Sequence, residues 1–181
     1  MHRTNWRNHK GEAGKGLMAG LVGGLAASWT MNQFQTLLSK ASEQNTQQQQ
    51  REDQGAQSQE VEDGDATQKA AAKLSESIFN RSLTKQEKDV AGSVLHYAFG
   101  ATMGGLYGVT AELFPVVKAG FGLPFATALW VGADEVAVPA LGLSKSPLEY
   151  PISNHASALA AHWVYGASTE LLRRTVRTLL G

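Results

Sequence analysis

Six ionisable side chains lie in stretches of this sequence that are otherwise almost free of charge. They are His96, Glu112, Asp134, Glu135, His162 and Glu170. A charged side chain costs about 3 kcal/mol at the centre of a lipid bilayer, so each of these groups needs a reason to be there. Carboxylates removed from water hold protons near neutral pH, and a nearby histidine can exchange them. These residues therefore favour a site that handles protons or small solutes.

Two of the carboxylates also have simple structural interpretations. Glu170 precedes Arg173 and Arg174 by three and four residues, a spacing that predicts an ion pair on the surface of a helix. Glu112 falls at the expected end of a helix, where it is either solvated or paired with Lys118. Both alternatives stay open at this point.

The other four groups are harder to assign. For His96 we expect contact with headgroup water or a backbone carbonyl, and for His162 a hydrogen bond between helices. Asp134 and Glu135 are adjacent and would point about 100° apart on a helix, so one packing contact cannot hide both. A structural partner, or a helix break near Pro139, is the alternative to a proton or cation site.

The sequence offers little for enzyme chemistry. It has no cysteine, which excludes a thiol nucleophile, a thiolate metal site and disulfides. It contains no Gly-x-Ser-x-Gly elbow, no phosphate-binding glycine loop and no His-x-x-x-His ligand pair. The 16 basic residues balance the 16 acidic ones, which argues against nucleic acid as a partner. We expect no enzymatic activity, no cofactor and no metal.

The chain has four apolar blocks, and three of them carry the ionisable groups. Each is long enough for a helix that crosses about 30 Å of hydrocarbon. We predict transmembrane helices at 16–38, 93–114, 119–143 and 150–172. The expected fold is therefore all-α, an integral membrane four-helix bundle.

Glycines recur every four residues in two of these blocks. The rows are Gly16, Gly20 and Gly24 in the first block and Gly100, Gly104 and Gly108 in the second, with Gly166 in the fourth. Glycine inside a water-exposed helix costs about 1 kcal/mol relative to alanine. In a bilayer the same spacing lets helix backbones approach closely. The rows predict glycine-rich helix contacts and allow a homo-oligomer.

A long polar segment, 39–92, separates the first two blocks. Its part 41–67 is rich in Gln, Glu, Asp and Ser, and we predict disorder there because too little apolar area is available for burial. An amphipathic helix is expected at about 70–83. Thr84 and Glu87 then form a capping box that starts the second long helix.

Basic residues at the chain ends set the expected orientation. The segments 1–15 and 173–181 are both basic, which places both termini in the cytoplasm and the first loop in the periplasm. The alternative for the first block is a secretory signal peptide cleaved after 26–28. Three further apolar blocks favour the multi-pass arrangement.

Two runs of residues resemble a known family. The first is His96-x-x-Phe99 followed by Tyr107-x-Val109-x-Ala111-Glu112-Leu113-Phe114-Pro115-x-x-Lys118; the second joins Tyr150, Ala161-His162-Trp163-Val164 and Glu170-Leu171-Leu172-Arg173-Arg174-x-x-Arg177. This pattern resembles the YagU-like family of bacterial inner-membrane proteins over roughly the second half of the chain. The resemblance implies an inner-membrane protein of undefined biochemical activity, and it supplies no catalytic residues.

The leading functional hypothesis is a small inner-membrane protein that handles protons or small solutes through its acidic and histidine residues. The alternative is an interaction or envelope-maintenance protein, which oligomerises through a glycine zipper and binds partners with its periplasmic loop. A membrane enzyme is the third and weakest hypothesis. The lipid bilayer is the one partner expected in every case.

Overall fold

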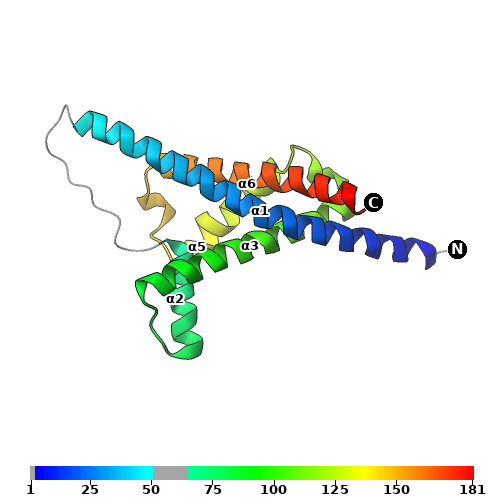
Figure 1. Ribbon diagram of the computed structural model, residues 1–181, viewed down its shortest axis with the longest axis horizontal. Helices are drawn as coiled ribbons and strands as arrows, with labels where there is room; N and C mark the ends of the chain where they lie inside the picture. Colours follow the sequence, from blue (N-terminus) through cyan, green and yellow to red (C-terminus); the bar gives the residue numbers. More distant parts are fainter. Residues whose placement is uncertain (1–2, 51–64) are drawn as a thin grey trace.

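The computed structural model describes residues 3–50 and 65–181, and over these ranges the chain is helical, with no strand. The elements are α1 Arg3–Gln50, α2 Ala66–Phe79, α3 Lys85–Leu113, the short turn η1 Pro115–Lys118, α4 Leu123–Trp130, the π-helix η2 Val131–Ala137, α5 Val138–Ala140, the short turn η3 Pro147–Glu149 and α6 Ile152–Leu179. The all-α class predicted from the sequence is confirmed. Figure 1 shows the long helices α1, α3 and α6 side by side, with α2 set across one end of α3.

Glycines bring α1 and α3 into backbone contact. A Cβ atom at Gly20 would collide with the Gly104 carbonyl, and one at Gly24 would collide with that of Gly100. Gly108 stands in the same relation to the backbone of Gly16. The two helices are therefore antiparallel, and larger side chains at these positions would force them apart.

The sixth helix, α6, packs against both α1 and α4. A buried cluster joins Ala27 and Met31 of α1 to Ala161 and Tyr165 of α6. Gly166 of α6 lies against the Gly122 backbone and Ala126, where a Cβ atom would not fit. Small residues thus set the spacing of α6 as well.

The first helix extends further than the sequence suggested. We predicted that the helical span would end at 38 and that disorder would begin at 41, but α1 continues to Gln50. Glutamine and glutamate are good helix formers, so a helix already started in the apolar block continues through them. Of the rest of the predicted disordered stretch, 51–64 lies outside the described residues, and 65–67 form the start of α2.

Capping side chains mark the beginning of both α2 and α3. Thr84 and Glu87 form the predicted capping box at the start of α3. The predicted amphipathic helix at about 70–83 is shifted toward the N-terminus as α2, because the Asp65 side chain accepts a hydrogen bond from the Gln68 N–H and starts the helix early. Asn80, in the left-handed conformation, ends it.

For the third block we predicted one continuous helix from 119 to 143, and this prediction is wrong. Gly120, Phe121 and Gly122 adopt positive φ angles, so α4 begins only at Leu123. The helix then widens into η2 and ends soon after Pro139. The fourth block forms a longer helix than predicted, because α6 continues through most of the predicted tail to Leu179.

None of the helices within residues 3–50 and 65–181 has both the length and the apolar character needed to cross a lipid bilayer. The membrane bundle therefore stays a prediction, while its helical content is established.

Candidate functional site

A cavity of about 920 Å³ lies between α1, α3, η2 and α6. Its volume falls in the usual range of ligand-binding cavities, about 300–1,000 Å³. The ionisable groups that line it in the central bundle are His96, Asp134, Glu135, His155 and His162. Four of the six residues singled out from the sequence therefore share one cavity.

The two adjacent carboxylates are carried by the π-helix η2, Val131–Ala137. Pro139 follows Glu135 by four residues, has no N–H to donate to its carbonyl, and would clash with that carbonyl in a regular α-helix. A wider turn relieves this conflict. Such π turns are rare and occur frequently at functional sites. The side chains of Asp134 and Glu135 thus project from a locally irregular helix, and each lies near a different histidine of α6.

Glu135 is paired with His155. The Nδ1 atom of His155 lies 2.7 Å from the Glu135 carboxylate, and its Nε2 lies 3.0 Å from the Pro147 carbonyl. A carbonyl oxygen only accepts, so Nε2 carries a hydrogen. The short contact at Nδ1 then requires a second proton between the imidazole and the carboxylate. The pair therefore holds one exchangeable proton.

Asp134 faces His162 in a looser arrangement. The Nδ1 atom of His162 donates to the Ala158 carbonyl at 2.9 Å and lies 3.8 Å from the Asp134 carboxylate. Because Nδ1 carries the hydrogen, Nε2 of the neutral ring is a free acceptor. His162 is almost fully buried, whereas the Asp134 side chain is 39% exposed. This pair is close enough to interact but is not hydrogen-bonded.

His96 completes the cavity wall from α3. Its Nε2 atom is buried and has no hydrogen-bond partner among residues 65–181 or in the described part of α1. Its ring contacts Tyr97 edge-on, with 5.6 Å between centroids. The expected contact with a backbone carbonyl is therefore not made through Nε2. A buried, unsatisfied nitrogen of this kind needs a ligand or water to complete it.

Glu112 and Glu170 do not join this cavity. They lie beyond the glycine contacts, at the opposite end of the bundle, where Glu170 receives hydrogen bonds from Arg173 at 2.8 Å and from Arg174 at 2.6 Å. Arg173 also donates to Glu112 at 3.1 Å. We refer to these residues, with Glu12 and Arg177, as the ion-pair network.

Two predictions about these carboxylates need correction. The partners of Glu112 are Arg173 and Arg177 rather than Lys118, because α6 extends alongside the end of α3. Glu170 pairs with the expected arginines, but it is completely buried and not on the surface. Helix packing, which the local spacing does not reveal, decides both outcomes.

Sequence reasoning missed His155 as a site residue. It lies seven residues before His162, and seven residues are close to two helical turns, so both rings project from one face of α6. That spacing was the available signal. It was obscured because His155 lies at the very start of the helix.

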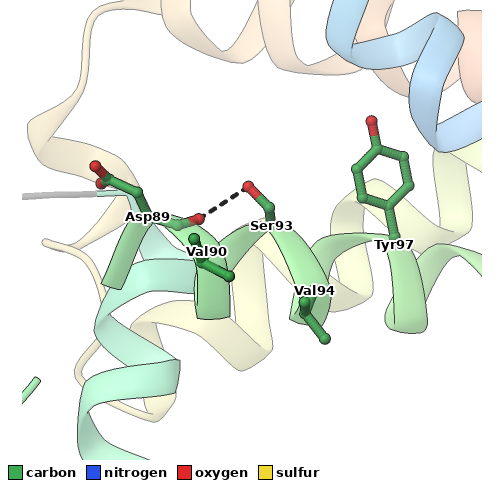
Figure 2. A pocket seen from close by; sticks show the side chains of 5 residues that line it. All are labelled: Asp89, Val90, Ser93, Val94 and Tyr97. Carbon is green, nitrogen blue, oxygen red and sulfur yellow. Dashed lines mark hydrogen bonds between the residues drawn. The ribbon is translucent and has the colours of Figure 1, made fainter. Parts of the chain in front are cut away.

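A second, shallower depression lies along α3 and is lined by Asp89, Val90, Ser93, Val94 and Tyr97 (Figure 2). The Ser93 hydroxyl donates to the Asp89 carbonyl at 2.9 Å, so it is already satisfied within its own helix. No histidine lines this depression. It therefore lacks the groups for proton or metal chemistry.

Within the described residues no three His, Asp or Glu side chains converge as a metal site would require. The fold and the site together define a helical bundle with a carboxylate–histidine cavity at one end. A family model described as a protein of unknown function, DUF1440, matches residues 69–171, more than half of the 181 residues. The chain belongs to this family of YagU-like uncharacterised proteins, which confirms the resemblance seen in the sequence. No curated protein and no solved structure matches it significantly.

Proposed function

We propose that this chain is a bacterial inner-membrane protein that handles protons or small solutes in the cavity between α1, α3, η2 and α6. The observation that carries the proposal is the presence of two carboxylate–histidine pairs, Asp134 with His162 and Glu135 with His155, in one cavity. All four residues lie within the stretch that matches the family.

The surface of α1 supports a lipid environment. Four large apolar side chains of α1 are each at least 40% exposed: Leu17, Val22, Leu25 and Trp29. The glycine row of the same helix, Gly16, Gly20 and Gly24, faces α3 instead. Large exposed apolar surfaces indicate a contact with lipid or with another protein. In the proposed arrangement the four predicted spans form an integral bundle with apolar side chains outward, both termini cytoplasmic and α2 periplasmic.

The proton chemistry follows from the two pairs. Glu135 and His155 already hold one exchangeable proton between them. Asp134 is exposed to the cavity and can take up a proton from water, and the free Nε2 of His162 is a second acceptor. Protonation of Asp134 or His162 changes the charge of the cavity by one unit. This allows uptake and release of a proton, or exchange of a proton for a small cation.

The test uses purified full-length protein in proteoliposomes with an imposed pH gradient. We expect wild-type protein to pass protons, and Asp134→Asn and Glu135→Gln to reduce the flux to the level of empty vesicles. Glu76→Gln, on the exposed face of α2 outside the cavity, is the matched control and keeps the wild-type flux. Infrared difference spectra report the carboxyl groups directly. Flux equal to that of empty vesicles in the wild type, with no carboxyl band titrating near neutral pH, would refute the proposal.

One observation favours the second candidate, an interaction or envelope-maintenance protein. Leu74, Ile78 and Phe79 of α2 are 50%, 63% and 74% exposed and form an apolar face with no cover from the described residues. The glycine rows, by contrast, are occupied by contacts within one chain. A partner would therefore dock on α2 rather than on a glycine zipper. Site-specific crosslinking from position 78 in cells tests this, and absence of any crosslinked species would count against it.

A further inference from the structure

We propose that the same cavity binds an organic cation, a primary or secondary ammonium group carried on an apolar body. This inference rests on the site of the proposed function and adds the class of solute. The ammonium group would lie between Asp134 and His162 and the apolar body against the α1 and α3 walls.

Two hydrogen-bond acceptors that line the same cavity, from Asp134 and His162, carry the inference. The Asp134 carboxylate receives no hydrogen bond from the described residues, and its nearest charged partner is His162 at 3.8 Å. The Nδ1 hydrogen of His162 is used by the Ala158 carbonyl, so the Nε2 atom of this almost fully buried ring is an acceptor without a donor. A group with several N–H donors and a positive charge satisfies both acceptors.

The charge of the wall selects a cation. The carboxylates lining the cavity are Asp65, Asp89, Asp134 and Glu135, and the one lysine is Lys145. The proton shared by Glu135 and His155 makes that pair neutral overall. With His96 and His162 uncharged, the other three carboxylates outnumber the lysine, so the lining is acidic and repels anions. A divalent metal ion fits less well, because no three potential ligands converge among the described residues. An ammonium group needs only one carboxylate and one further acceptor.

The size and the apolar lining of the cavity select an organic body. A volume of about 920 Å³ is far larger than an inorganic cation requires. Met31, Phe99, Met103 and Leu129 line it beside the polar groups. Methionine side chains adapt to varied apolar shapes, and the aromatic rings of Phe99 and Tyr165 can also attract a cation. The occupant is therefore an amphiphilic amine of moderate size.

The probe is phenethylamine, compared with 2-phenylethanol, which has a hydroxyl group in place of the ammonium. Binding to full-length protein in lipid nanodiscs is measured by calorimetry at neutral pH. We expect the amine to bind at least about tenfold more tightly than the alcohol, since hydrogen bonds to a charged group are stronger than those between neutral groups. Asp134→Asn removes this preference, whereas Glu76→Gln keeps it. Thermal unfolding of each variant shows that it is folded.

Equal binding of amine and alcohol, or amine binding unchanged in Asp134→Asn, would overturn the inference. The proton flux and the carboxyl infrared bands, measured without amine, test the proposed function independently. Titrating carboxyl bands without amine selectivity would leave proton handling intact and remove the amine as solute. Selective amine binding without proton flux would support the amine as a ligand of the cavity and refute proton handling.

Discussion

The two ends of this bundle use the same kinds of side chain in opposite ways. In the ion-pair network Glu170 is fully buried and both of its carboxylate oxygens accept hydrogen bonds from arginines. In the cavity Asp134 is partly exposed and stands 3.8 Å from its nearest charged partner. The glycine contacts between α1 and α3 separate the two ends (Figure 1).

This difference distinguishes a structural charge from a reactive one. A buried carboxylate whose two oxygens both accept hydrogen bonds from arginines has little acceptor capacity left, and its removal takes one acidic partner away from a buried arginine. A carboxylate with free acceptor capacity gains little from its surroundings and remains available to a proton or ligand. Removal of a carboxylate should therefore lower the stability of the fold when it is made in the ion-pair network, and lower the proton flux when it is made in the cavity.

The largest expected effect on stability comes from Glu170→Ala. Arg173 is only 3% exposed, and without Glu170 it keeps Glu112 as its remaining acidic partner among the described residues. Breaking a buried pair in this way costs about 3–5 kcal/mol. Thermal unfolding in detergent, followed by circular dichroism, should show a strongly lowered midpoint. Glu76→Ala on the exposed face of α2 is the control, and a similar loss in both variants would contradict the assignment.

A smaller loss is expected from Gly104→Ala, between the two ends. The added Cβ would meet the Gly20 carbonyl and the Gly24 backbone, and such overpacking costs about 1–3 kcal/mol. Gly132→Ala is the matched control, because nothing lies within 4 Å of a Cβ built there. Unfolding midpoints of the two variants are compared. Equal stability would show that α1 and α3 do not depend on close backbone contact.

Tyr165→Phe should cost less again. The Tyr165 hydroxyl donates to the Gly100 carbonyl at 2.6 Å and ties α6 to α3 beside the cavity. Loss of one such hydrogen bond costs about 1 kcal/mol. Tyr97→Phe, in the shallower depression on α3, serves as the comparison (Figure 2). If Tyr97→Phe lowered the unfolding midpoint as much as Tyr165→Phe, the tie between helices would not be the cause.

Asp134→Asn should leave stability almost unchanged, within about 0.5 kcal/mol, because no hydrogen bond to the carboxylate is lost. Its effect should fall on proton flux instead. Unfolding midpoint and flux are measured on the same preparation. A midpoint loss as large as that of Glu170→Ala would remove the contrast between the two ends.

The sequence predicted the helical class and the segments that carry the site, because apolar blocks and capping residues act locally. The Thr84–Glu87 box is the clearest case, since both partners lie within four residues. What the sequence indicated least well was where each helix begins and ends.

Long-range pairing was the part that local patterns could not supply. Glu112 pairs with Arg173 and Arg177 because α6 continues past residue 172, which depends on how three helices pack. The partner of Glu135 was missed because the π-helix redirects its side chain toward His155. Register changes of this kind arise from a conflict between Pro139 and the helix, and spacing rules for regular helices do not include them.

The smallest expected effect concerns the pH dependence of the capping box at the start of α3. Hydrogen bonds from the Thr84 backbone N–H and hydroxyl, with Arg81 nearby, hold the pKa of Glu87 below its usual value of 4.5. A carboxyl group with a lowered pKa in the folded state stabilises the fold above its unfolded pKa, and this contribution is lost as the pH falls through the folded pKa. The protection of amides at the start of α3 against hydrogen exchange, taken relative to the intrinsic exchange rate at each pH, should therefore fall below about pH 4.5 in the wild type. Glu87→Gln keeps the capping geometry without a titrating group, so its exchange should not share this added acid sensitivity. Identical acid sensitivity in both proteins would show that the Glu87 carboxylate does not stabilise the start of α3.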